Sequence, residues 1–356
     1  MFLSLLYCII LAITGFLCAL PVFLYICKDI SAEYKIKKDV WVYMWFLSLF
    51  FVSALYCVLP DFKDMIYNLK YKNIIAVFTL AALIYVAFLL EIKKLLYRVL
   101  VVSSAIVVLL IPEHTLLFEN VIPVWAERLV IFISLFLITF FAGILNAMPA
   151  IFSIFVLTVL SGVAILSILG GVPLFMGLTA SVLCGIWLGY LRFNWDSREV
   201  SLNSGACASA GFLLAGFLLL GSMELSGPSM LILISYLSAE TLWAVIRRYI
   251  WRIKEPELYY NTVYFVCYTK DISADAIMFS ITKIGIVNVI FSCFQLYAPN
   301  SFSIPFCSLI INLWLLNMLY HASDNSLTFA QANENFLGEL KEGFNLVKKS
   351  LKRRKK

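Results

Sequence analysis

The chain is an almost unbroken series of apolar segments that short polar loops separate. A helix of roughly 20 apolar residues is long enough to cross a hydrocarbon core of about 30 Å. A bilayer admits only helices or closed barrels, and the strict alternation of membrane strands is absent from this sequence. The pattern predicts eleven spans, at 2–27, 40–60, 73–91, 99–112, 128–146, 151–169, 172–190, 206–222, 229–246, 275–296 and 305–322. We therefore expect an all-α, polytopic membrane helix bundle.

Composition strengthens this expectation. Hydrophobic residues make up 63% of the 356 residues and charged residues only 13%, whereas a soluble domain has about 45–50% apolar and about 25% charged residues. No soluble domain fits between the apolar segments, so residues 1–322 are expected to form a single transmembrane domain. Segment 2–27 lacks a basic start and a small-residue cleavage site, so we interpret it as the first span and not as a removed signal peptide.

The basic residues predict how the bundle is oriented. If the N-terminus lies outside, the cytoplasmic segments hold 22 Lys and Arg residues and the external segments hold four. These cytoplasmic segments are 28–39, 92–98, 191–205, 247–274 and the tail 323–356. Because short cytoplasmic loops carry the excess of Lys and Arg, we expect the N-terminus outside and the C-terminus in the cytoplasm. The polybasic tail is of the kind that anionic membrane lipids attract, and we do not expect it to bind nucleic acid.

Cysteine and histidine give little indication of chemistry. The nine cysteines occur singly, mostly within apolar segments and without a CxxC pair, so we interpret them as small apolar packing residues. The two histidines, His114 and His321, are far apart and lack acidic neighbours at ligand spacing. The sequence therefore predicts no metal site built on histidine or cysteine.

A long motif lies in the second half of the chain. From Gly185 to Ala215 the sequence reads GIWLGYLRFNWDSREVSLNSGACASAGFLLA. This stretch resembles the polyprenyl-phosphate N-acetylhexosamine-1-phosphate transferases, the membrane glycosyltransferase family that includes the phospho-MurNAc-pentapeptide translocase. That family usually has G-x-x-x-G-F-L-x-x-N-x-x-P-A-x-I-F-x-G-D-x-G-S-x-x-x-G-F here. The matching positions are Gly185, Gly189, Tyr190, Leu191, Asn194, Val200, Gly211 and Phe212.

Two further segments resemble the same family in the same order. Glu240 to Arg248 reads ETLWAVIRR, where the family has D-T-L-x-V-I-x-R-R. Leu145 to Phe152 falls where the family has an Asn followed three residues later by D-G-x-D-G. The resemblance covers about residues 70 to 300. It implies packed helices whose cytoplasmic loops form a nucleotide-sugar pocket, and transfer of a sugar-1-phosphate from a UDP-sugar to undecaprenyl phosphate with Mg²⁺.

The acidic residues that this chemistry needs are mostly replaced. Mg²⁺ prefers carboxylate oxygens, and here it has to offset the charge of several phosphates. The family's loop aspartates fall on Pro149, Phe152 and Ser204, and its early Asp-Asp pair falls near Glu91, which leaves one carboxylate. Its His-x-His-His cluster falls on the segment 262–266, which reads TVYFV. We therefore expect no intact catalytic set and no metal ligands.

Other residues remain as candidates. Four residues keep the family's residue type and are candidates for a nucleotide or lipid-phosphate pocket: Asn146, Asn194, Arg247 and Arg248. As alternatives, the two Asn residues could cap helices, and the two Arg residues could anchor the topology on the cytoplasmic side. The weak substitutes for the lost acids are Glu91, Asp196 and Glu199. Asp196 and Glu199 are three residues apart, a spacing that can put both on one helical face. A Mg²⁺ cofactor is expected only if these acids have taken over the catalytic role.

Three functions remain open at this stage. The first is a catalytically degenerate family member, a pseudoenzyme of the bacterial cytoplasmic membrane that binds undecaprenyl phosphate or a partner enzyme of envelope polysaccharide assembly. The second is an active transferase whose acidic residues have moved. The third is a small-solute transporter, although Lys283 is the only clear intramembrane charge of spans five to ten and no broken-helix repeat stands out.

Overall fold

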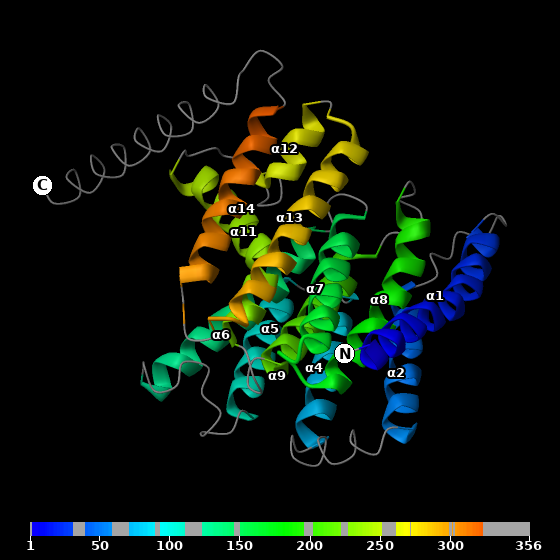
Figure 1. Cartoon of the computed structure of the whole chain (residues 1–356). Coiled ribbons are helices and arrows are strands. Elements are labelled where there is room, and N and C mark those ends of the chain that lie inside the picture. Colours follow the sequence, from blue (N-terminus) through cyan, green and yellow to red (C-terminus); the bar gives the residue numbers. More distant parts are fainter. Residues whose placement is uncertain are drawn as a thin grey trace, which may run out of the picture.

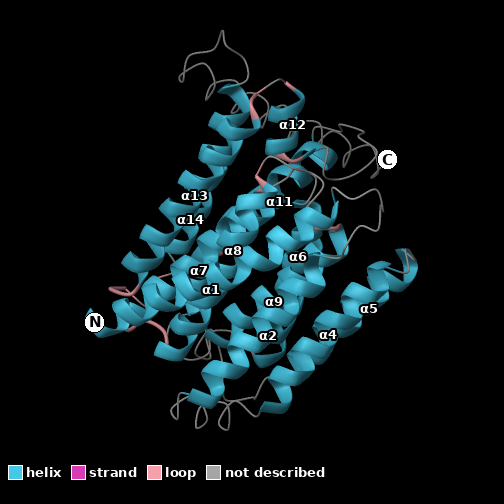
Figure 2. Ribbon diagram, turned by 90° about the vertical axis from the view of Figure 1, so that its right-hand side faces the viewer, coloured by secondary structure: helices cyan, strands magenta, loops and turns pink. Residues whose placement is uncertain are grey.

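In the residues it describes, the computed structural model contains helices joined by turns and short loops, and no strands. The described residues are 2–30, 40–58, 71–89, 93–110, 123–145, 150–195, 202–221, 227–250, 261–270, 272–298, 301 and 303–322. The helices are α1 (Phe2–Ile30), α2 (Val40–Val58), α4 (Tyr71–Leu89), α5 (Lys93–Leu110), α6 (Val124–Ile144), α7 (Ile151–Ile168), α8 (Leu174–Asn194), α9 (Ser204–Gly221), α10 (Gly227–Leu233), α11 (Ser235–Val245), the π-helical turn η4 (Ile246–Ile250), α12 (Val263–Thr269), α13 (Ala274–Gln295) and α14 (Ser303–Ala322). The all-α class is therefore confirmed for the described chain (Figures 1 and 2).

Helix positions agree with the apolar pattern, but the predicted number of membrane spans does not hold. Among the described helices, six are long and apolar enough to cross a membrane, or seven if the bent pair α10–α11 is one span. The chain is thus a protein with several membrane spans, and the prediction of eleven is wrong by this measure. Parts of α2, α5 and α9 form only shorter apolar helices, Val40–Phe51, Arg98–Leu109 and Ser204–Leu219. At a rise of about 1.5 Å per residue they fall short of the bilayer core.

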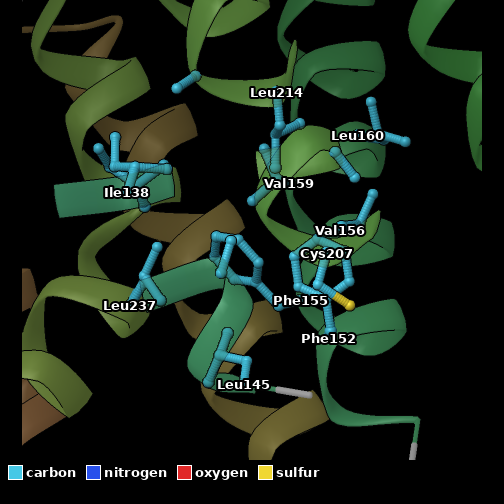
Figure 3. Packing of buried hydrophobic residues seen from close by; sticks show 14 of the residues in the cluster. Ile138, Leu145, Phe152, Phe155, Val156, Val159, Leu160, Cys207, Leu214 and Leu237 are labelled. Atoms are coloured by element: carbon cyan, nitrogen blue, oxygen red, sulfur yellow. The ribbon is translucent and has the colours of Figure 1, made fainter. Parts of the chain in front are cut away.

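Helices α7 and α8 form the centre of the bundle (Figure 1). Their apolar windows are 67% and 72% buried within the protein, compared with 17% for α1. Helix α1 packs along α8, α13 packs along α7, and α6 packs against α9. Figure 3 shows how Phe152 and Phe155 of α7 meet the side chains of neighbouring helices in this core. The remaining helices surround this centre.

The contact between α1 and α8 is unusually close because glycine lies on both helices. A Cβ atom at Gly185 would overlap the carbonyl oxygen of Ala12, and one at Gly15 would overlap that of Val182. At Gly189, one turn further along α8, an added Cβ would lie 2.8 Å from the Cβ of Ala19. Small residues spaced four apart let membrane helices approach backbone to backbone. Gly185 and Gly189 therefore have a packing role of their own.

Candidate functional site

The short helix α12 lies at the end of the bundle where α14 ends (Figures 1 and 2). It contacts α11, α13 and α14. Polar and charged side chains gather beneath and beside it, and we refer to them as the α12 cluster. Its members are Tyr236, Glu240, Arg247, Asn261, Lys270 and Tyr320.

Glu240 fixes the start of α12. Its Oε1 accepts a hydrogen bond from the backbone N–H of Val263 at 2.6 Å and another from that of Tyr264 at 3.4 Å. The first N–H groups of a helix have no partner within the helix, and they favour a negative charge. Glu240 is only 2% exposed although it belongs to α11. The structure therefore buries this acid inside the bundle.

Two cations lie over the ring of Tyr320. The guanidinium carbon of Arg247 is 5.4 Å from the ring centroid, and Nζ of Lys270 is 4.8 Å from it. Cations at such distances are attracted by the electron-rich face of an aromatic ring. Arg247 is 7% exposed, while Lys270 is exposed to the surroundings. The cluster thus combines a buried guanidinium with an accessible ammonium group.

Several buried polar atoms of the α12 cluster have no hydrogen-bond partner within the described chain. They are Oε2 of Glu240, the hydroxyl of Tyr236 and both amide atoms of Asn261. Buried polar atoms are costly to leave unsatisfied, so such atoms are ordinarily met by water or by a ligand. The thiol of Cys267 on α12 cannot supply a negative charge, because burial raises its pKa to about 12. The cluster is therefore a polar site with capacity for a bound polar group.

Asn194 lies elsewhere, at the end of α8 in the core of the bundle. Its Nδ2 donates to Oγ of Ser153 on α7 at 3.4 Å, and the residue is 5% exposed. The neighbouring Trp195 donates from Nε1 to Oδ1 of Asp275, the second residue of α13, at 2.9 Å. Asn194 therefore connects α8 to α7 beside the joint between α8 and α13.

A groove lies between α1 and the end of α8. It is lined by Phe16 of α1 and by Leu188, Leu191, Arg192 and Trp195 at the end of α8. Arg192 is the only charged residue of this lining and is exposed. A mostly apolar groove with one cation in its lining suits an amphipathic molecule with an anionic head.

The structure brings together some of the sequence candidates and separates others. Arg247 and Arg248 lie in η4, and Arg247 joins the α12 cluster. The segment 262–266 lies against Glu240, so two stretches aligned separately with the transferase family meet in space. Asn194 belongs to the α7–α8 contact instead. The candidates Glu91, Asn146, Asp196 and Glu199 lie outside the described residues.

Sequence reasoning missed Lys270 and Tyr320 as partners of Arg247. Tyr320 lies beyond the stretch that resembles the family, and nothing in its local pattern distinguishes it from other aromatic residues of an apolar helix. The seven-residue spacing of Glu240 and Arg247 could have been noticed, because it puts both on one face of a helix. In the part of the chain that the structure describes, no group of three or more His, Cys, Asp or Glu residues could hold a metal ion.

Comparison with known proteins leaves the site to be interpreted from its own chemistry. No family model, no curated protein and no solved structure matches this chain.

Proposed function

We propose that this chain is an integral protein of the bacterial cytoplasmic membrane and a catalytically degenerate relative of the polyprenyl-phosphate sugar-1-phosphate transferases. In this proposal it binds undecaprenyl phosphate and serves as a partner or regulatory subunit in envelope polysaccharide assembly. The N-terminus faces outward and the α12 end of the bundle faces the cytoplasm, in agreement with the excess of Lys and Arg in the segments at that end.

The observation that carries the proposal is the pair of cations over Tyr320. Within the α12 cluster and the adjacent Arg248, positive charge is carried by Arg247, Lys270 and Arg248, and Glu240 contributes a carboxyl group. Guanidinium groups bind phosphate oxygens through paired, charge-assisted hydrogen bonds. A lipid phosphate can meet these groups while its hydrocarbon chain stays in the bilayer.

Two further features support a lipid-phosphate ligand and a lost reaction. The groove between α1 and α8 offers a mostly apolar lining that includes Arg192. The positions that carry the family's metal-binding aspartates hold Pro149, Phe152 and Ser204 in this sequence. Side chains of this kind cannot hold a divalent cation between two phosphates, because Mg²⁺ gives up its water reluctantly and needs carboxylates.

The binding site is tested by replacing Arg247 with glutamine in the full-length protein. We expect undecaprenyl phosphate to bind the purified wild-type protein, and Arg247→Gln to weaken binding about 10- to 100-fold, since a hydrogen bond to a charged group contributes about 1.5–3 kcal/mol. Native mass spectrometry in detergent with titrated lipid measures both affinities. Lys283→Gln is the matched control, because it removes one positive charge from an exposed position within α13. Absence of lipid binding, or an equal loss in the control, would contradict the proposed site.

The proposed absence of sugar-1-phosphate transferase activity is tested separately. We expect no UMP release when the purified protein is mixed with undecaprenyl phosphate, a panel of UDP-sugars and Mg²⁺ or Mn²⁺. UMP release that disappears in Asp196→Asn or Glu199→Gln would establish the active transferase with relocated acids and overturn the degenerate assignment. A family member that carries the full acidic set is the positive control for the assay.

A small-solute transporter is a second candidate, and the bent pair α10–α11 favours it. These helices are inclined at 56° to one another across a break of one residue. Interrupted helices form the solute and ion sites of many secondary transporters. Uptake of labelled solutes by proteoliposomes would distinguish this function from lipid-phosphate binding.

A further inference from the structure

A cavity lies between α10 and the neighbouring pair α6 and α9. One of its lining residues is Ile234, where the helical run breaks at φ −93° and ψ 2° and α10 turns by 56° from α11. After this break α11 contacts α6, whereas before it α10 packs mainly against α13 and α14. The bend therefore leaves space beside α10, which we refer to as the α10 pocket.

Two contacts hold α10 in its bent position. Oγ of Ser292 on α13 donates to the backbone carbonyl of Ser229 on α10 at 2.9 Å, and both residues are buried. At Gly162 on α7, an added Cβ would overlap the side chain of Leu233, so α10 also packs closely against α7. Neither Ser229 nor Leu233 lines the α10 pocket. The pocket therefore cannot close by movement of α10 without loss of these contacts.

The α10 pocket has an apolar lining and a volume of about 110 Å³. Its lining includes Val130, Ser134 and Ile138 of α6, Leu218 of α9, and Leu231 and Ile234 of α10. Of the described residues that line it, only Ser134 has a polar side chain. A buried water needs two to four polar partners, whereas an apolar cavity of about 150 Å³ stays dry and binds benzene or xenon. The α10 pocket is therefore suited to an apolar guest.

The α10 pocket opens to the surroundings of the bundle between α6 and α10. Val130 is 43% exposed and Leu231 is 38% exposed, so these two residues form its mouth. Ile138, Leu218 and Ile234 are each at most 9% exposed and form its inner part. Because α6 is long and apolar enough to cross a membrane, the mouth faces the hydrocarbon chains of the bilayer.

We propose that the α10 pocket binds one acyl chain of a membrane phospholipid. Such chains surround the mouth, and a chain that enters restores the dispersion contacts that the lining of a void lacks. The described lining carries no charged side chain, so the pocket recognises the chain and not the headgroup. The site does not depend on the proposed function, because Arg247 lies 13 residues beyond Ile234, or about 20 Å along the helical run.

Ser134→Phe tests the α10 pocket, since a benzyl group occupies most of a cavity of this size. Native mass spectrometry of the purified full-length protein, titrated with phosphatidylcholine, should show one lipid bound about tenfold more weakly than in the wild type, which corresponds to the loss of roughly ten atom contacts. Ser134→Ala is the matched control, because it removes the hydroxyl and fills nothing, and it should bind as the wild type does. Phosphatidylglycerol with the same chains should show the same loss. A loss confined to phosphatidylglycerol, or equal affinities of Ser134→Phe and the wild type, would overturn the proposal.

Photolabelling of the wild-type protein tests the same site without a substitution. Proteoliposomes carry phosphatidylcholine with a diazirine midway along one acyl chain, and mass spectrometry locates the label. Phe279 and Ile286 on α13 are 58% and 53% exposed, more than the two residues at the pocket mouth. A bound chain should nevertheless put more label on Val130, Ser134 and Leu231 than on α13, and label that follows exposure would overturn the proposal. Added undecaprenyl phosphate should leave the pocket label unchanged; its loss would assign the pocket to that lipid instead.

Discussion

Gly185→Leu is expected to separate α1 from α8 and to lower the stability of the bundle by about 3 kcal/mol. Gly185 faces the backbone of α1, where an added Cβ would overlap the carbonyl oxygen of Ala12 and lie 2.9 Å from the backbone nitrogen of Phe16. If the overlapping atoms of α1 belonged to a side chain, that side chain could rotate away. They are backbone atoms, however, and these move only together with the whole of α1. The substitution therefore forces the helices apart along one of the most extensive contacts of the fold.

Thermal unfolding in detergent, followed by size-exclusion chromatography, measures this effect. Gly216→Ala on α9 is the matched control, because the nearest atom to its added Cβ is the side-chain Cγ1 of Val77 at 3.1 Å. Alanine also favours the helix over glycine by up to about 1 kcal/mol, so the control should be neutral or slightly stabilising. A Gly185→Leu protein that unfolds at the wild-type temperature would show that α1 and α8 do not pack in this way.

The positions of the helices could be predicted from the sequence, but the bend of the ninth segment could not. Long apolar segments specify helices in a bilayer almost by themselves, and α7, α13 and α14 begin within two residues of the predicted starts. The segment 229–246 has the same composition, yet it divides at Ile234. At this break Oγ of Ser235 accepts a hydrogen bond from Nδ2 of Asn312 and lies 3.0 Å from Oγ of Ser308, and both residues belong to α14, more than 70 residues away. Local pattern carries no signal for such a tertiary contact.

The residues of the candidate site could likewise be identified only in part from the sequence, because some of them are brought together by tertiary contacts. Arg247 was identified from residue type and order, and Glu240, whose carboxyl group it influences electrostatically, lies two turns away on the same helical run. The Tyr320 ring and Lys270 join them only through the packing of α12 and α14. The Gly185 and Gly189 pair was interpreted through its resemblance to a family motif, whereas the structure assigns it a direct packing role. Sequence reasoning finds residues that share an element and misses residues that only the fold brings together.

Glu240→Ala is expected to destabilise the α12 end of the bundle by about 3–5 kcal/mol, because it removes the acid that accompanies a buried Arg247. The variant also leaves the N–H groups of Val263 and Tyr264 without their acceptor. Glu240→Gln keeps one acceptor oxygen at the same place but loses the charge, so it should cost roughly half as much. Hydrogen exchange at the amides of α12, together with thermal unfolding, measures both effects.

The double variant Glu240→Ala with Arg247→Leu shows which part of the loss comes from the uncompensated charge. Removing the second of two oppositely charged buried groups relieves most of the penalty that removal of the first creates, so the double variant should be more stable than Glu240→Ala alone. Exchange at the amides of Val263 and Tyr264 should remain fast in the double variant, because their acceptor is still missing. If the two substitutions instead added without coupling, Glu240 would act on α12 through its hydrogen bonds alone, and the stability of that helix would not depend on the charge of Arg247.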